Sequence, residues 1–307
     1  MNPVRIIVDS TADVTPEVEQ RVGVVPLTVH FGQEHFVDGV DIDHIVFYEK
    51  LANCQVLPTT SQATPFDFTQ AYEKAIENGE DVVVITISSL LSGTYQSAVI
   101  AAEDFPGRVY VVDSKTVTIG SAILADYALQ LKDRGLCAAD IAEKLTLERE
   151  NIHLIALLDT LEYLKRGGRI SKTVAFAGGL LTIKPFICLD GGEVNLIGKA
   201  RGSKQGGLQL DQEILNAGGV DFDRPARLGY TGLSDEGLQK YLQGSSLMGD
   251  KGLPISMVGG VVGTHAGPGA IAVAFFQPSK KPLKGFPQGK PFVFPSVQKR
   301  KDVVYCY

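Results

Sequence analysis

Short apolar runs alternate with helical patterns over the first half of the chain. Such alternation is typical of a parallel sheet covered by helices on both faces, because each strand must be buried on both sides. The predicted strands are RIIVDS, GVVPLTVHF, DVVVITIS, RVYVVDS and IHLIALL. We therefore expect an N-terminal three-layer α/β domain with a parallel sheet over residues 1–158.

Local signals mark several element boundaries in this half. Thr64 precedes a proline and stands three residues before Asp67, which predicts a capped helix start, and Asn78-Gly79 predicts its end. The glycine-punctuated segment from FGQEHF to VDGVDID indicates a small hairpin outside the main sheet.

The pattern changes from about residue 159. Asp190-Gly191-Gly192 lies between two strand patterns and predicts a hairpin. Two helical segments and further strands follow, up to the apolar run AIAVAFF. We expect a second, α+β domain over residues 159–277, with a mostly antiparallel sheet and helices on one face.

Residues 278–307 differ in composition from the rest. This segment holds five prolines and a net charge of +6, against −12 for the remaining chain. Such a composition favours a basic, Pro-rich flexible tail. An arm that docks on an acidic partner or an anionic membrane surface is the alternative.

Composition argues against several classes of function. A net charge of −6 and a pI near 5.4 argue against nucleic acid as the main partner. The four cysteines are scattered without metal-site spacing, so we expect free thiols and no metal. No apolar segment is long enough for a secretory signal or a membrane span, which favours a cytoplasmic protein with at most transient membrane contact.

Small hydroxyl residues occur at three predicted strand ends or helix starts. They are Asp9-Ser10-Thr11, Thr59-Thr60-Ser61 and Ser92-Gly93-Thr94. Hydroxyls together with free helix-start N–H groups suit a carboxylate or phosphate, and glycine allows close approach of the backbone. Each corner taken singly is better explained as a helix cap than as a ligand site.

His265 lies in the segment GTHAGPGA, where glycines and a proline predict a rigid loop. A histidine in such a loop can donate one N–H at neutral pH while the fold fixes its other nitrogen. A surface turn is the alternative interpretation. The other histidines, His30, His35, His44 and His153, have no comparable setting and are assigned no role.

Three classes of function fit these residues. The first is a binding protein; the second is a serine hydrolase that uses Ser92 and His265, although no Gly-x-Ser-x-Gly motif is present. The third is phosphate or cofactor binding at the same corners. No nucleotide-binding or metalloprotease motif is found, so no cofactor is predicted.

Eight stretches between residues 4 and 276 resemble, in the same order along the chain, the DegV family of bacterial lipid-binding proteins. They are IIVDSTADVTPE, TTSQATP, ITISSLLSGTYQSA, VVDSKTVTIG, LDTLEYLKRGGRIS, LLTIKPFICLDGGEV, KARG and GTHAGPGAIAVAF. The resemblance implies a two-domain protein that holds one long-chain fatty acid between its domains. It also implies a non-enzymatic subunit that presents the carboxylate to the ATP-binding subunit of a fatty acid kinase, for conversion to acyl-phosphate.

The resemblance also assigns roles to individual residues. The expected carboxylate contacts are Thr60, Ser61, Ser92, Gly93 and His265. Arg169 is expected near the head group and Arg201 at the partner surface. Both belong to a basic cluster with Lys165, Arg166, Lys172 and Lys199, which is otherwise explained as a solvated helix end.

Overall fold

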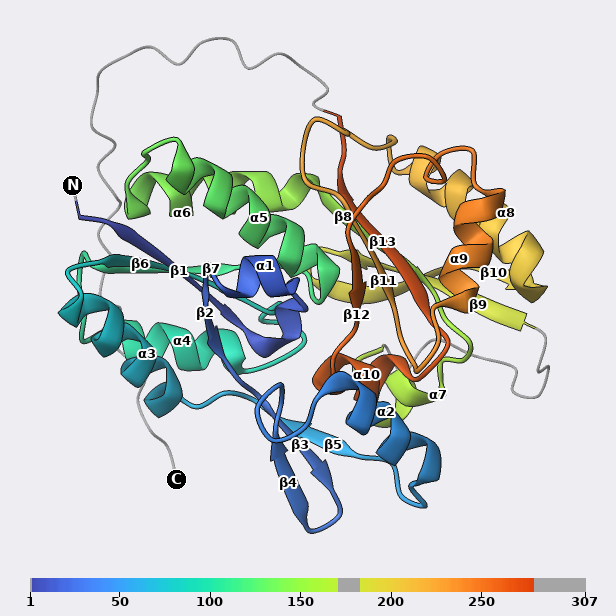
Figure 1. The fold of residues 1–307 in the computed structure, drawn as a ribbon, viewed down its shortest axis with the longest axis horizontal. Helices are drawn as coiled ribbons and strands as arrows, with labels where there is room; N and C mark the ends of the chain where they lie inside the picture. Colours follow the sequence, from blue (N-terminus) through green and yellow to red (C-terminus); the bar gives the residue numbers. More distant parts are fainter. Residues whose placement is uncertain (1, 171–182, 279–307) are drawn as a thin grey trace, which may run out of the picture.

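A computed structural model describes residues 2–170 and 183–278. Two main sheets lie side by side, each with its own helices, and a smaller sheet projects beneath them (Figure 1). The predicted tail and part of the predicted basic cluster, including Lys172, lie outside the described residues.

The first sheet has the order β2-β1-β6-β7 and is entirely parallel. The α5 and α6 helices cover one face and α3 and α4 cover the other, as Figure 1 shows. This confirms the predicted three-layer arrangement. The strands are β1 (Val4–Asp9), β2 (Gly23–Val25), β6 (Asp81–Thr86) and β7 (Val109–Asp113). The helices are α1 (Pro16–Glu19), α3 (Pro65–Glu77), α4 (Thr94–Ala102), α5 (Ile119–Asp133) and α6 (Ala138–Glu148), with 3-10 turns at Ser10–Ala12 and Arg149–Asn151.

The second sheet has the order β10-β9-β8-β13-β11-β12 and is antiparallel except for its β11–β12 edge. Its β9–β10 hairpin turns at the predicted Asp190-Gly191-Gly192. The strands are β8 (Ile152–Leu157), β9 (Ile183–Asp190), β10 (Glu193–Arg201), β11 (Arg227–Tyr230), β12 (Ile255–Met257) and β13 (Ile271–Phe276). The associated helices are α7 (Glu162–Gly167), α8 (Gly202–Asn216), α9 (Glu236–Gly244) and α10 (Gly260–Ala266).

The small sheet is the predicted hairpin excursion with one strand added. Its order is β4-β3-β5, from β3 (Thr28–Phe31), β4 (Glu34–Val37) and β5 (Thr59–Ser61). The α2 helix (His44–Asn53) connects β4 to β5. The Thr64 capping box at the start of α3 also forms as predicted, with Thr64 and Asp67 bonding each other's backbone N–H.

Two strand assignments were wrong. IHLIALL was predicted in the parallel sheet, but β8 pairs antiparallel with β9 and β13 in the second sheet. GVVPLTVHF was predicted as one strand, but Pro26 separates β2 from β3, which belong to different sheets. An apolar run carries no information about its partners, so periodicity alone could not assign β8. The division of the chain at residue 158 remains a prediction.

The second sheet is covered on both faces, in contrast to the prediction of helices on one face. Ile155 and Leu157 of β8 face α8 and α9, in one hydrophobic cluster with Leu210 and Leu238. The alternate residues Leu154 and Ala156 belong to the cluster that α5 shares with both main sheets. The α5 helix therefore joins the two sheets, since it packs on β1 and β6 as well as on β11 and β13.

Candidate functional site

A cavity of about 350 Å³ lies where the two main sheets, β5 and α10 meet. Such a volume lies in the range of small-molecule pockets. Most of its wall is apolar. The apolar lining residues are Leu27, Ile87, Leu91, Val117, Leu154, Ala156, Leu158, Leu164, Ile187, Leu189, Val194, Val258, Val261, Val262, Ala266, Ala270 and Ala272.

Small side chains explain why this space is open. Ala156 of β8 and Ala272 of β13 are direct partners across the two strands, and both line the cavity. Directly opposite residues of an antiparallel pair lie on the same face of the sheet. Two alanines side by side leave room that larger side chains would fill, so the sequence of β8 and β13 makes one side of the cavity.

Part of the cavity wall is polar and includes most of the residues predicted from sequence; because Thr60 contacts His265, and Arg169 bonds to Leu91 beside Ser92, we call this part the polar end. The predicted residues found there are Thr60, Ser61, Ser92, Gly93, Arg169 and His265. They come from β5, from the loop before α4, from the segment after α7 and from α10. Residues more than 200 positions apart in the sequence therefore share one wall.

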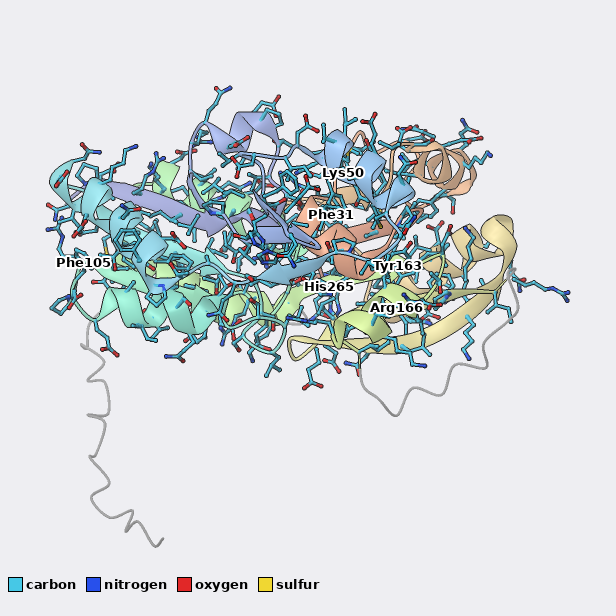
Figure 2. All side chains as sticks on the ribbon, turned by 90° about the horizontal axis from the view of Figure 1, so that it is seen from below. Phe31, Lys50, Phe105, Tyr163, Arg166 and His265 are labelled. Atoms are coloured by element: carbon cyan, nitrogen blue, oxygen red, sulfur yellow. The ribbon has the colours of Figure 1, made fainter. Side chains whose placement is uncertain are left out.

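His265 lies on the last turn of α10, and not in a loop as predicted. Figure 2 labels it close to Tyr163 of α7, the helix that packs against α10. Its Nε2 lies 3.1 Å from Oγ1 of Thr60, and its buried Nδ1 has no hydrogen-bond partner among the described residues. Burial, together with the positive charge of Arg169, lowers the pKa of His265 to about 4. The imidazole is therefore neutral at physiological pH and can offer one N–H to a ligand.

The Ser92-Gly93 corner forms a second group of donors. Ser92 Oγ lies 2.9 Å from Oγ1 of Thr94 and accepts the Thr94 N–H at 3.2 Å. A Cβ at position 93 would lie 2.1 Å from Oε1 of Gln62, so only glycine allows the Gln62 side chain to lie here. Gln62 in turn donates to Ser97 Oγ at 2.9 Å. The corner is thus held by side-chain contacts to α4.

Arg169 lines the same end of the cavity. Its guanidinium donates to the carbonyls of Gly167 at 2.6 Å and Leu91 at 3.2 Å, which link the α7 segment to the loop before α4. A fixed guanidinium beside neutral donors provides positive potential for an anion. Arg201 does not line the cavity; it is exposed at the end of β10.

Sequence reasoning missed three polar residues of the cavity wall: Gln62, Thr118 and Thr231. Thr118 has a positive φ of 49° and donates to buried Asp13, and Thr231 Oγ1 accepts the Ala270 N–H at 2.8 Å. No local pattern distinguishes Thr118 and Thr231 from other polar positions. Only for Gln62 was there a signal, its place directly after the predicted Thr60-Ser61 corner.

The Asp9-Ser10-Thr11 corner is not part of this cavity. The carboxylate of Asp9 accepts the N–H groups of Thr11 at 3.0 Å and Ile87 at 2.7 Å, and Ser10 Oγ accepts the Leu27 N–H at 3.1 Å. Its polar groups therefore bond to the protein itself. The helix-cap alternative explains this corner better than a ligand site does.

The geometry does not support the serine hydrolase alternative. A serine nucleophile needs a hydrogen bond to its base. Ser92 instead bonds with Thr94, and His265 bonds with Thr60. Within the part of the chain that is described, no carboxylate is bonded to His265 Nδ1 to orient the ring.

Metal sites, cysteine pairing and membrane spans were each assessed over the part of the chain that the structure describes. Across residues 2–170 and 183–278, no group of three or more His, Cys, Asp or Glu could hold a metal ion. The three described cysteines, Cys54, Cys137 and Cys188, have free thiols. No described helix is both long and apolar enough to cross a membrane.

Fold and site together define a class: an α/β protein with one parallel and one mostly antiparallel sheet, and an apolar cavity with neutral donors at one end. The chain matches the family model "Uncharacterised protein, DegV family COG1307" over residues 3–278, and it belongs to the DegV family. A DegV domain-containing protein of Deinococcus radiodurans is 37% identical over 281 residues, which cover 88% of this chain and 97% of that protein.

Solved structures share the fold. A DegV family protein from Thermus thermophilus, described as fatty acid binding, is 31% identical with a TM-score of 0.80, over 90% of this chain and all of that one. The Fatty Acid Kinase (Fak) B3 protein of Streptococcus pneumoniae, loaded with linoleic acid, is 24% identical with a TM-score of 0.78, over 90% of this chain and 99% of that one. The similarity to the Streptococcus pneumoniae protein, at 24% identity, shows a shared fold alone.

Proposed function

We propose that this protein binds one long-chain fatty acid, with the carboxylate at the polar end of the cavity and the acyl chain along its apolar wall. The carboxylate contacts are Thr60, Ser61, Ser92, Gly93 and His265, with Arg169 nearby. One observation carries the proposal: a single cavity with a mostly apolar wall is also lined by all five of these residues. The fatty acid binding described for the Thermus thermophilus relative supports it.

Neutral donors suit a ligand that must be exchanged. Hydrogen bonds from hydroxyls and a neutral imidazole offset the desolvation of an ionised carboxylate without a direct salt bridge that would hold it in place. Burial of about sixteen methylenes at ~0.8 kcal/mol each contributes roughly 13 kcal/mol before the costs of binding are subtracted. The acyl chain would therefore dominate affinity, and the head group would set orientation.

The bound carboxylate is presented to a separate ATP-binding kinase subunit. There a carboxylate oxygen would attack the γ-phosphorus of ATP, and ADP would leave as acyl-phosphate forms. Arg201, exposed at the end of β10, is proposed to contact that subunit. This protein then supplies a substrate site and no catalytic group of its own.

Native mass spectrometry of the purified protein, followed by denaturation and identification of any released molecule, tests the binding function. We expect one long-chain fatty acid per chain. A phosphorylated ligand, or turnover of acyl esters that is lost in Ser92→Ala, would instead support one of the two alternatives.

Substitutions test the head-group contacts. Ser92→Ala and His265→Ala should each weaken fatty acid binding about 10-fold or more, because each removes a hydrogen bond to a charged group. Ser89→Ala is the matched control, since Ser89 lies in the same loop but bonds to Asp113 and does not line the cavity. Unchanged affinity in both site variants would contradict the assignment.

The partner contact has its own test. Arg201→Ala should retain bound fatty acid but lower the rate of acyl-phosphate formation with the kinase subunit. Arg134→Ala, at an exposed arginine at the end of α5, is the control. Equal rates for the Arg201 variant and the unaltered protein would remove Arg201 from the partner surface.

A further inference from the structure

One face of α10 follows the cavity along the whole length of the helix. The cavity-lining residues of α10 and of the segment just before it are Val258, Val261, Val262, His265 and Ala266. Their spacing of three and four positions is that of a single helix face. Six positions separate the N-cap residue, Gly259, from His265, which corresponds to about 9 Å at about 1.5 Å per residue. The cavity therefore extends from the head-group residues to the start of α10.

Two threonines line the cavity at the start of α10. Asp13 accepts the N–H of Gly259 at 2.8 Å and the hydroxyl hydrogen of Thr118, so Thr118 lies beside the N-cap. Thr231 directly follows β11, whose last residue accepts the Val258 N–H at 2.8 Å. Both side chains are buried, since Thr118 is 5% and Thr231 3% exposed. A mostly apolar wall therefore carries two buried hydroxyls away from the polar end.

Strand register places the Thr231 side chain on the cavity face of the second sheet. Gly229 of β11 is the direct partner of Ala272, which lines the cavity. Alternate residues of a strand share a face, so Thr231, two positions after Gly229, lies on that face as well. Its bonds to Ala270 continue the pairing: the Thr231 N–H donates to the Ala270 carbonyl at 3.0 Å, and Thr231 Oγ1 accepts the Ala270 N–H at 2.8 Å.

Counting hydrogens shows what the two hydroxyls still offer. A hydroxyl has one hydrogen and two lone pairs. Thr231 Oγ1 accepts one backbone N–H, and its own hydrogen has no acceptor among the described residues. Thr118 gives its hydrogen to Asp13 and keeps lone pairs. The two threonines come from elements in contact, because a Cβ on Gly229 of β11 would lie 3.2 Å from Cγ2 of Ile119 at the start of α5. The wall thus offers one donor and one acceptor, the pair that a hydroxyl group on a ligand requires.

We propose that Thr231 and Thr118 form a second polar contact for the acyl chain, and that the preferred ligand is a long-chain fatty acid with a hydroxyl group near the middle of its chain. With the carboxylate at His265, the threonines lie about 9 Å away along α10, beside the middle of a long chain rather than its first carbons. In a fully apolar pocket, a hydroxyl loses its hydrogen bonds to water, which weakens binding about 10- to 100-fold. Here it accepts from Thr231 and donates to Thr118. This inference rests on the proposed fatty acid function and specifies the class of fatty acid.

Affinities for two ligands of equal length test the inference. The ligands are stearic acid and stearic acid with a hydroxyl on its tenth carbon. We expect the unaltered protein to bind the hydroxy acid at least as tightly as stearic acid. Thr231→Val should weaken hydroxy acid binding about 10-fold, because it removes the donor, and should change stearic acid binding less than twofold. Thr231→Ser retains the hydroxyl and should keep the preference of the unaltered protein.

The ratio of the two affinities, measured on one variant, separates ligand contact from structural support. Thr231→Val also leaves the Ala270 N–H without its acceptor and should lower the melting temperature, but this loss affects both ligands equally. Thr264→Val is the matched control, because Thr264 is a buried threonine of α10 that donates to the Gly260 carbonyl and does not line the cavity. Its affinity ratio should equal that of the unaltered protein. If Thr231→Val fails to fold, Thr118→Ala takes its place, since it removes the acceptor and should lower the same ratio.

The outcomes separate the two proposals. If stearic acid binds but the hydroxy acid binds about 10-fold or more weakly, the second polar contact is overturned and fatty acid binding stands. An affinity ratio that Thr231→Val leaves unchanged overturns it as well. Failure of the unaltered protein to bind either ligand overturns the proposed function and this inference together.

Discussion

Asp13 offers a direct test of the electrostatics beside the cavity. Its carboxylate is buried, accepts the Gly259 N–H at 2.8 Å in front of α10, and accepts the hydroxyl of Thr118 in the cavity wall. Burial raises its pKa from 3.8 to about 7, although His44 and these hydrogen bonds act in the opposite direction. The folded protein therefore holds this proton more tightly than the unfolded chain does.

The sign and size of the effect on stability follow from proton linkage. Between about pH 4 and pH 7 the folded state binds more protons at Asp13 than the unfolded state, so this group lowers stability as the pH rises. Each unit of difference between the pKa in the unfolded chain and the pKa in the folded protein corresponds to 1.36 kcal/mol. Above pH 7, Asp13 therefore lowers the free energy of unfolding by about 4 kcal/mol in total. Below pH 4 the cost is absent.

Asp13→Asn should remove this cost while it keeps the contacts. The amide oxygen can accept the Gly259 N–H, and the amide N–H can donate to Thr118 Oγ1. Relative to the unaltered protein, we expect little difference in unfolding free energy near pH 4. A gain that grows with pH should level off above pH 7 at about 4 kcal/mol or less.

Urea denaturation at several pH values from 4 to 8.5 measures this difference. Asp250→Asn, at an exposed aspartate, is the matched control. A pH-independent difference for Asp13→Asn, or one that falls as the pH rises, would refute the reasoning.

Three further predictions concern the cavity. Ala272→Leu should fill the apolar end, so that long-chain binding falls at least 10-fold while the melting temperature is retained, as calorimetry would measure; unchanged binding would contradict the proposed chain path. Gly167→Ala places a Cβ 2.1 Å from Nδ1 of His265 and should therefore displace the imidazole. Fatty acid binding should weaken about as much as in His265→Ala. Unchanged affinity would show that binding does not require a fixed position of the imidazole. His265 should titrate with a pKa near 4 by NMR, so its ionisation should cost stability only as the pH falls from 6.5 toward 4; a pKa near 6.5 would contradict its burial.

Local patterns predicted much of the fold. The Thr64 capping box, the Asp190-Gly191-Gly192 turn and the parallel strands β1, β6 and β7 all depend on a few neighbouring residues, and each was found where expected. The sheet to which β8 belongs depends on strands that lie far away in sequence. An apolar run suits either sheet, so this assignment needed the structure.

The same distinction applies to the site. Thr60 and Ser92 were found because hydroxyls occur at a predicted helix start and at a predicted strand end, and the resemblance to a known family joined them to His265. Thr118 and Thr231 were missed because nothing nearby in sequence suggests a role. They line the same cavity only through the packing of elements that are distant in sequence, which no local pattern specifies.

The position of β13 has a consequence for synthesis. This strand is the last in the described chain, yet it lies in the interior of the six-stranded sheet, between β8 and β11. The strands of the parallel sheet, by contrast, are complete by Asp113. During translation the first sheet can assemble early, whereas the apolar edges of β8 and β11 stay unpaired until residues 271–276 leave the ribosome. The nascent chain therefore carries an unpaired sheet edge from the time β8 is made until β13 emerges.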